Sequence, residues 1–388
     1  MLTRRGFLKT AGFGLTGIVT ARRFDAGIPK PTSTRTARLY VGTYTQGKSE
    51  GIYRCRFDLA SGKLAVESVT RGVANPSFLA IDRIRGRLFC VNEVSEYDGK
   101  PGGSVSAFSL DPITGDLQFV NTCPSHGADP CYITNDAHGR FVLVANYTGG
   151  SLAVLPVHND GSLGAATHVV QHTGSSVKAR QQGPHTHSVL LDSTGRFAYA
   201  ADLGLDKVMI YGFDNQRGRL LPSTTAWAAL KPGAGPRHLA FSPDGSVLYV
   251  ANELDSTMTM FLIDRTTGDL AHRKTTSTLP SHVQGENFPA DIHVAPSGRH
   301  VYVSNRGRDS IAVFAVSPDK RDFSFVKDES TGGKWPRNFA IDPAGQFIVV
   351  ANQKSDMITV FTIHPESGTL SPTGYVADVP SPACLKFL

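Results

Sequence analysis

One short pattern recurs seven times along this chain of 388 residues. Each copy starts with a proline or threonine and an apolar run, turns, and continues into a second apolar run that ends in asparagine or aspartate. The opening residues are Pro76, Pro130, Thr186, Pro236, Pro289, Pro336 and Pro382. In the six complete copies the closing residue follows the opening one by sixteen positions. Such a fixed spacing indicates one structural unit repeated along the chain.

Each repeat contains four segments with the composition of β-strands, and sustained helical periodicity is absent after residue 36. The turns between the segments, such as Pro243–Gly245 and Thr267–Asp269, carry the Gly and Asp residues that hairpins favour. Repeats made only of strands predict an all-β fold, a seven-bladed β-propeller with four antiparallel strands per blade.

The seventh copy is incomplete, because only ACLKFL follows Pro382. Its missing strands stand at the other end of the chain, where RLYVGTY (38–44), GIYRCRFD (51–58) and KLAVESVTRG (63–72) are strand-like. We therefore predict that the C-terminal strand joins three N-terminal strands and closes the ring. Closure would remove the exposed strand edges that an open array carries.

The first residues combine an arginine pair, Arg4 and Arg5, with the Gly-rich apolar run AGFGLTGIVTA (11–21). This order predicts a twin-arginine export signal, the alternatives being a chance arginine pair or a membrane anchor. The apolar run is too short to span a bilayer comfortably. We therefore expect residues 1–36 to be a signal peptide and linker, and residues 37–388 to be the propeller. The mature protein is expected to be periplasmic or extracellular, without stable membrane insertion once the signal is cleaved.

The leader also carries the net charge of the chain, which is +6. Residues 1–36 contain seven Lys/Arg and one Asp, which leaves 32 basic and 32 acidic residues in the remainder. Residues 37–388 therefore carry no formal net charge and show no stripe of basic residues, which argues against a nucleic-acid partner. The five cysteines have no CxxC or zinc spacing, so we interpret them as small apolar residues. We expect the protein to be a monomer.

The register of the repeat places certain residues round one mouth of the central channel. In an antiparallel blade, the start of the first strand and the end of the second lie at the same end. Ionisable side chains gather there on the third to sixth copies: His187, Arg237, Glu253, Arg306 and Arg337. Aromatic side chains gather on the seventh, first and second copies: Tyr44, Phe78, Tyr132 and Tyr147. Further polar candidates at this mouth are Glu93, Asp291, Gln353 and His185.

Several arginines with few acids on one rim predict unpaired cations, and hence a small anionic ligand whose ring packs on the aromatic side chains. The alternative is that these residues form ion pairs between blades with no chemical role. His185 and His187 have the spacing of a metal-ligand pair on a strand, but no third ligand is evident, so we predict no metal. The absence of a GxSxG motif disfavours a serine nucleophile.

Several motifs in this chain resemble those of the seven-bladed propeller lactonases. They include VGTYT (41–45), NPSFLAID (75–82), VANYTGGSLAV (144–154), GPHTHSV (183–189), GPRHLAFSPDG (235–245) and WPRNFAIDPAGQFIVVANQ (335–353). This family comprises 6-phosphogluconolactonase-type proteins and the fungal carboxy-muconate cyclases, and the resemblance runs from about residue 38 to the C-terminus. In the cyclase branch, a His, two Arg and a Glu at the channel mouth are the proposed catalytic set. By motif they correspond to His187 (or His185), Arg237, Glu253 and Arg306.

The resemblance implies a lactonase that opens a sugar-acid lactone without a metal or organic cofactor. In that case arginines would stabilise the oxyanion, and Glu253 or His187 would move a proton. Two alternatives stay open: a muconate-type cycloisomerase that forms a lactone, and a non-catalytic propeller that binds an anionic sugar or a protein. The expected partner is a small anionic lactone or sugar acid.

Overall fold

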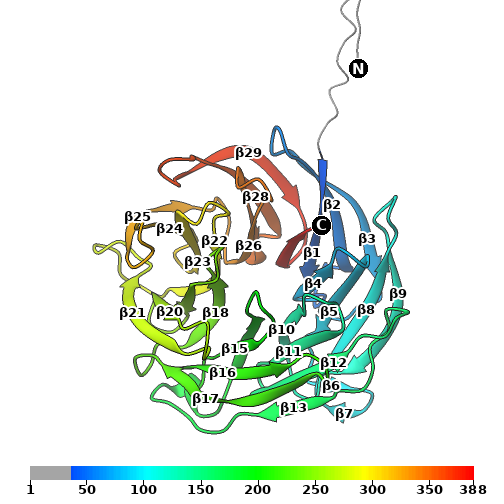
Figure 1. The fold of residues 1–388 in the computed structure, drawn as a ribbon. Helices are drawn as coiled ribbons and strands as arrows, with labels where there is room; N and C mark the ends of the chain where they lie inside the picture. Colours follow the sequence, from blue (N-terminus) through cyan, green and yellow to red (C-terminus); the bar gives the residue numbers. More distant parts are fainter. Residues whose placement is uncertain (1–35) are drawn as a thin grey trace, which may run out of the picture. The chain divides into compact units, whose positions relative to one another are not determined.

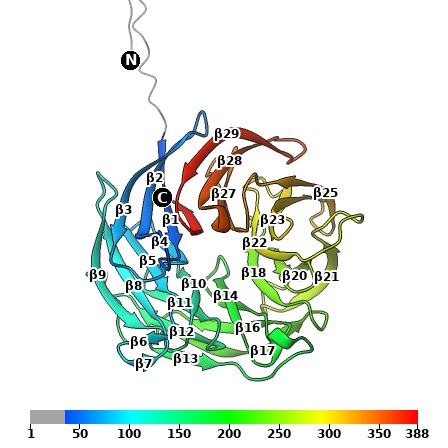
Figure 2. The same cartoon turned by 180° about the vertical axis from the view of Figure 1, so that it is seen from behind.

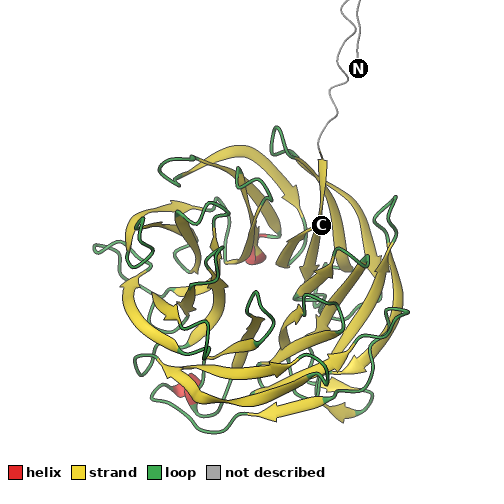
Figure 3. Cartoon of the chain, viewed as in Figure 1, coloured by secondary structure: helices red, strands yellow, loops and turns green. Residues whose placement is uncertain are grey.

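The computed structural model describes residues 36–388, which form a ring of strands around a central channel (Figures 1 and 3). Seven four-stranded sheets and one two-stranded sheet account for the strands of this part of the chain. None of its helices has the length and apolar character that a membrane crossing requires. The predicted all-β, seven-bladed propeller is therefore confirmed, while the predicted twin-arginine motif lies outside the described residues.

Six blades are each built from four strands in chain order, with only β6 and β7 intervening in the first of them, and the first-named strand of each blade lies nearest the channel (Figure 1). The first three are β4 (Leu79–Asp82), β5 (Arg87–Asn92), β8 (Ser104–Leu110) and β9 (Leu117–Pro124); β10 (Pro130–Asn135), β11 (Phe141–Asn146), β12 (Ser151–Pro156) and β13 (His168–Gln171); and β14 (Thr186–Leu191), β15 (Phe197–Asp202), β16 (Lys207–Asp214) and β17 (Arg219–Ala229). The next three are β18 (Pro236–Phe241), β19 (Val247–Asn252), β20 (Thr257–Ile263) and β21 (Leu270–Ser277); β22 (Phe288–Val294), β23 (His300–Arg306), β24 (Ser310–Val316) and β25 (Phe323–Ser330); and β26 (Pro336–Ile341), β27 (Phe347–Asn352), β28 (Met357–Ile363) and β29 (Leu370–Asp378).

The seventh blade joins the two ends of the described chain. Its strands are β30 (Pro382–Phe387), β1 (Thr36–Thr43), β2 (Gly51–Asp58) and β3 (Leu64–Arg71). β30 pairs with β1 in antiparallel register, with Thr43 opposite Pro382 and Leu39 opposite Phe387. It also contacts β26 and β4, the innermost strands of the two neighbouring blades. The predicted closure is confirmed, and both views of the ring show the C-terminus beside β1 (Figures 1 and 2).

The sixteen-residue spacing is a pairing register. Pro130 lies opposite Asn146, Thr186 opposite Asp202, and the same holds at Pro236, Pro289 and Pro336 with their closing asparagines. The first strands of neighbouring blades contact one another all round the ring. The starts of the first strands and the ends of the second strands therefore meet at one mouth of the channel.

The blades pack through apolar faces and are tied together at the opposite end of the ring by side chains that reach the neighbouring blade. Tyr199 and Tyr302 donate their hydroxyl protons to Gly268 O and Gly368 O, each at 2.9 Å. Arginines at the beginning of strands make similar ties. These bonds join Arg38 to Ile113 O, Arg87 to Asn159 O, Arg196 to Arg265 O and Arg299 to Pro365 O.

Three segments interrupt the regular repeat. A short hairpin, β6 (Glu96–Tyr97) and β7 (Lys100–Pro101), lies between the second and third strands of the first blade. The long connection from β13 to β14 contains the 3₁₀ turn η1 (Ala179–Gln181), and a second turn, η2 (Gln353–Ser355), follows β27. The first of these turns brings an additional charged side chain to the mouth.

Candidate active site

A β-bulge marks the start of the innermost strand in six blades. The pairing register shifts by one residue directly after the opening residue of β10, β14, β18, β26 and β30, and over the first residues of β22. A bulge leaves a residue outside the strand ladder and redirects its side chain. The residues at the five single-residue shifts are Cys131, His187, Arg237, Arg337 and Ala383. Three of these are predicted site residues, so the bulges present them at the mouth.

Glu253 is the centre of the charged cluster. It follows β19, and its Oε2 lies 3.0 Å from Arg237 Nε and 2.7 Å from Arg306 Nη2. Its second oxygen, Oε1, accepts a hydrogen bond of 2.7 Å from Nη1 of Arg180. The side chains of Glu253, Arg237 and Arg306 are at most 6% exposed. The expectation of unpaired cations is therefore wrong for Arg237 and Arg306, because both pair with this carboxylate.

Arg180 is the one member of the cluster that the repeat does not predict. It lies on η1, where the fully buried Gln181 donates from Nε2 to Leu203 O at 2.8 Å and to Asp206 Oδ1 at 2.7 Å. These bonds fix the turn over the mouth. Arg180 also donates to the Tyr147 hydroxyl at 2.9 Å, and its side chain is 47% exposed. It is thus the outermost cation of the cluster, accessible to a ligand that enters from solvent.

The charges and the burial of the cluster shift the pKa values of its members. Burial alone would raise the pKa of Glu253, but the charges of Arg306, Arg237 and Arg180 outweigh it and hold that pKa well below its ordinary value. Burial, with the charges of Arg306 and Arg337, lowers the pKa of Arg237 to about 9, so this group remains protonated at neutral pH. Three guanidinium groups around one carboxylate leave a net positive site.

This pairing predicts a pH-dependent stability that one substitution removes. The folded protein holds the pKa of Glu253 below its unfolded value of about 4.3, so the stabilisation is complete above that pH and is lost as pH falls towards the folded-state pKa. Glu253→Gln should flatten this dependence and lower the free energy of unfolding at pH 7 by roughly 3–5 kcal/mol, since buried arginines lose their partner.

Chemical denaturation of both proteins between pH 7 and pH 3 measures this effect. Glu366→Gln is the matched control, because Glu366 pairs with Arg299 but is 88% exposed. Parallel stability curves for the wild type and Glu253→Gln would contradict a buried ionised Glu253.

A second polar group lies on the neighbouring part of the rim. Arg337 donates to the Tyr44 hydroxyl at 2.6 Å, and its guanidinium carbon lies 5.1 Å from the centre of the Tyr44 ring. The Tyr44 hydroxyl donates to Glu93 Oε2 at 2.8 Å, and Ser77 donates to the same oxygen. The predicted aromatic and ionisable residues therefore do not form separate groups on this part of the rim, because Tyr44 connects Arg337 to Glu93.

A layer of buried, mutually contacting side chains lies beneath the rim. His238 shares a hydrogen bond of 2.7 Å with Asp291, whose other oxygen contacts His293 at 3.0 Å and accepts a bond from Asn338. The ring of Tyr132 stacks on Phe78 at 4.1 Å and meets His238 edge-on at 5.2 Å. Both oxygens of Asp291 are thus already occupied, and Asp291 and Tyr132 form the floor of the site.

His187 lies between the cluster and this floor. Its ring centre is 5.2 Å from that of His238 and 5.3 Å from that of Tyr147, and its Nδ1 lies 3.5 Å from Cys131 Sγ. Burial, followed by the charges of Arg237, His238 and Arg337, holds the pKa of His187 well below its ordinary value. His187 is therefore a neutral imidazole at pH 7, with one ring nitrogen unprotonated.

The other predicted residues are less directly connected to the cluster. His185 stacks on Tyr147 with ring centres 4.6 Å apart, and its Nδ1 lies 3.0 Å from Tyr147 O. Gln353 lies on η2, where its side-chain oxygen is buried without a hydrogen-bond partner among the described residues. Within residues 36–388, no group of three His, Cys, Asp or Glu side chains is placed to hold a metal ion.

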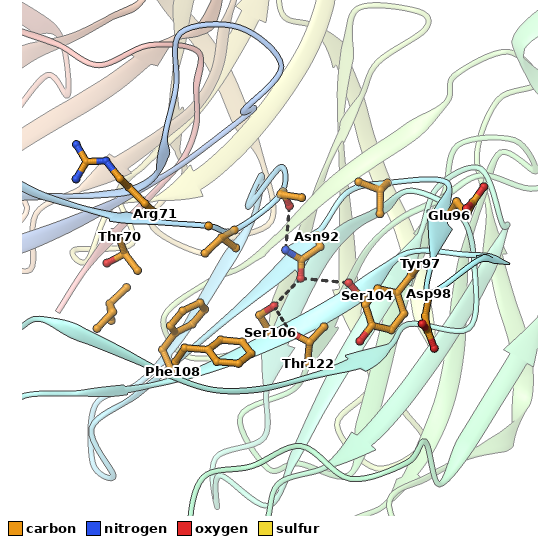
Figure 4. Close-up of a pocket in the computed structure, with 16 residues that line it drawn as sticks. Thr70, Arg71, Asn92, Glu96, Tyr97, Asp98, Ser104, Ser106, Phe108 and Thr122 are labelled. Carbon is orange, nitrogen blue, oxygen red and sulfur yellow. Dashed lines mark hydrogen bonds between the residues drawn. The ribbon is translucent and has the colours of Figure 1, made fainter.

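A separate cavity of about 650 Å³ lies between β3 and the first blade (Figure 4). Its lining includes Asn92, which accepts a hydrogen bond of 2.7 Å from Ser106, and Ser106 contacts Thr122 at 2.8 Å. None of the residues predicted at the channel mouth lines it. Asn252, Thr259 and Thr275 are linked in the same order in the fourth blade, where Asn252 donates to Thr259, so this chain of polar contacts recurs in the repeat.

Comparison with known proteins agrees with this architecture. Residues 38–387 match the family described as "Lactonase, 7-bladed beta-propeller". The chain belongs to this lactonase family. It is 36% identical over 349 residues to a 6-phosphogluconolactonase of Bacillus subtilis (strain 168), covering 90% of this chain and 97% of the relative.

Solved structures of this lactonase family superpose closely on the propeller. A periplasmic gluconolactonase from Pseudomonas aeruginosa has a TM-score of 0.85 and 38% identity, over 91% of this chain and 99% of that one. A putative 6-phosphogluconolactonase from Bacteroides fragilis NCTC 9343 also has a TM-score of 0.85, with 35% identity, over 93% of this chain and 99% of that one.

Proposed function

We propose that this member of the lactonase family hydrolyses a sugar-acid lactone at the mouth of its channel, as a carboxylic ester hydrolase. The observation that carries this proposal is the cluster in which Glu253 orients Arg237 and Arg306 beside the neutral imidazole of His187. The similarity to a 6-phosphogluconolactonase and to a gluconolactonase supports a sugar-acid lactone as the substrate.

The chemistry follows from the charges of these residues. Water attacks the lactone carbonyl carbon, and His187 accepts the proton that the water loses. The carbonyl oxygen becomes an oxyanion, which the guanidinium groups of Arg237 and Arg306 stabilise. When the intermediate collapses, the bond to the ring oxygen breaks, and protonated His187 returns its proton to that oxygen. The product is an open-chain hydroxy acid.

Glu253 has a different role in this proposal from that of a base. Both of its oxygens already face guanidinium groups, Oε2 those of Arg237 and Arg306 and Oε1 that of Arg180. Its contacts instead fix the guanidinium groups in position before the substrate arrives. Arg180, which is half-exposed, would then bind an anionic substituent of the lactone or the carboxylate of the product.

The proposal is tested with a panel of lactones, with and without a phosphate group, and with the variant His187→Gln. We expect the wild type to release acid faster than the spontaneous rate, and His187→Gln to lower kcat by about 10²–10⁴-fold, as loss of a general base does. Formation of a lactone from a muconate, with no hydrolysis, would support the cycloisomerase instead. Binding of a sugar acid without turnover would support a non-catalytic protein.

We also propose that residues 1–36 direct export by the twin-arginine route, so that the enzyme acts in the periplasm or outside the cell. The arginine pair at Arg4 and Arg5 supports this, as does the similarity to a periplasmic gluconolactonase of Pseudomonas aeruginosa. Fractionation of cells that produce the full chain tests it, with Arg4→Lys/Arg5→Lys as the variant. Retention of the variant in the cytoplasm is expected, and unchanged export would contradict the proposal.

A further inference from the structure

A second cationic site lies at the opposite end of the ring from the channel mouth. A cavity of about 540 Å³ is formed by the turns between the first and second strands of blades one and two and by the turns between the third and fourth strands of blades two and three. Its charged and ionisable lining residues are Arg85, Arg87, His138, Arg140 and His158. Within the described chain, no Asp or Glu side chain lines it.

Structural ties between blades do not account for all of these arginines. Arg140 occupies the same place in its blade as Arg196 and Arg299, directly before the second strand. Those two bind carbonyl oxygens of the neighbouring blade, Arg265 O and Pro365 O. Arg140, in contrast, has no side-chain hydrogen bond or ion pair within residues 36–388, and its Nε is buried without a partner. A guanidinium held in this way points to a ligand that supplies the missing acceptor.

The carboxylates closest in sequence to the cavity residues are already engaged. Asp82 pairs with Arg85 at 3.2 Å, and one oxygen of Asp136 accepts the backbone amides of Arg140 and Phe141 at 2.6 and 2.8 Å. Asp160 is bound by the hydroxyl of Ser162 at 2.7 Å. In the part of the chain that the structure describes, the guanidinium groups of Arg87 and Arg140 therefore have no carboxylate to neutralise them.

We propose that this cavity binds a small phosphate-bearing anion. Guanidinium groups present paired N–H donors that match phosphate oxygens, and Arg85, Arg87 and Arg140 come together at one site. The cavity volume lies within the range of small-molecule sites, and its lining is mostly polar, which suits a sugar phosphate or inorganic phosphate. The site lies away from the mouth, so the inference does not depend on the proposed lactonase activity.

Titration calorimetry with inorganic pyrophosphate at low salt tests the proposal on the full-length propeller. We expect Arg140→Gln to weaken pyrophosphate binding by about tenfold or more, in line with loss of a charge-assisted bond. The matched control is Arg196→Gln, which removes the equivalent arginine from the next blade and should leave binding unchanged. Lactone hydrolysis should also be unchanged in Arg140→Gln.

Further outcomes show where on the protein pyrophosphate binds and which kind of phosphate compound the site takes. If Arg180→Gln abolishes pyrophosphate binding and Arg140→Gln does not, the anion binds only at the mouth and the proposal is wrong. Equal affinity for wild type and Arg140→Gln would also overturn it. Sedimentation with phosphatidylglycerol vesicles separates the two sources of phosphate: co-sedimentation that Arg140→Gln abolishes indicates a lipid headgroup, whereas pyrophosphate binding without co-sedimentation indicates a soluble ligand.

Discussion

Replacing Arg237 with lysine is expected to reduce kcat/KM for the lactone by about 10²–10³-fold, the cost of losing one oxyanion donor. Arg237 uses several nitrogens at once: Nε faces Glu253 at 3.0 Å, and Nη1 donates to Ala290 O and lies 3.2 Å from His238 Nε2. A lysine ammonium keeps the positive charge but cannot reproduce this planar arrangement. Steady-state kinetics with the best lactone of the panel measures the effect.

The conservative substitution separates geometry from charge. Arg217→Lys serves as the control, since Arg217 is 79% exposed and pairs with Asp214 at the surface. We expect this variant to match the wild type, and circular dichroism and thermal melting to show that Arg237→Lys remains folded. Near-normal activity in Arg237→Lys would mean that any cation in this position is sufficient, and that Arg237 does not bind the oxyanion through its fixed geometry.

Deleting residues 382–388 is expected to prevent folding of the propeller. β30 buries Leu385 and Phe387 against the seventh blade, and burial of each such side chain stabilises by about 1.5–3 kcal/mol. Its loss also exposes the edge of β1 and removes the bond of 2.7 Å from the Leu385 amide to Asn338 Oδ1. The free energy of unfolding of a domain is only about 5–15 kcal/mol, so these losses together remove most of it.

Size-exclusion chromatography and thermal melting of the truncated protein test this expectation. An exposed strand edge favours association, so soluble aggregates or insoluble protein are the expected result. The control is Lys386→Ala, which changes a side chain of β30 but leaves its backbone pairing with Tyr40 intact. A truncated monomer that melts at the wild-type temperature would refute the account of ring closure.

The fold was accessible from sequence because the repeat encodes a pairing register. The distance from Pro236 to Asn252 is the length of a hairpin whose two ends meet, and the structure pairs these two residues. The same register places Arg237 and Glu253 at one mouth, and they are found 3.0 Å apart. Where functional residues stand at the ends of repeated strands, the sequence alone predicts which of them lie at the same end of the channel.

The rest of the site depends on structural features that the repeated pattern does not encode. Arg180 lies on an irregular connection, so no copy of the pattern indicates where its side chain goes. The bulges that redirect His187 and Arg237 have no evident residue signature in the repeat, because Cys131 and Arg337 occupy the same place in other blades. The pairing of Arg237 and Arg306 with one carboxylate likewise depends on three different strand ends, whose side-chain directions the sequence does not specify.

The most direct measurement is a crystal structure of the mature protein with gluconolactam, a lactam analogue of the proposed substrate that resists hydrolysis. We expect the analogue to bind at the channel mouth, with its carbonyl oxygen within hydrogen-bonding distance of the guanidinium of Arg237 or Arg306. His187 should face the carbonyl carbon across the space for one water molecule. An analogue bound elsewhere, in a protein that hydrolyses the corresponding lactone, would contradict the assignment of the active site to this mouth.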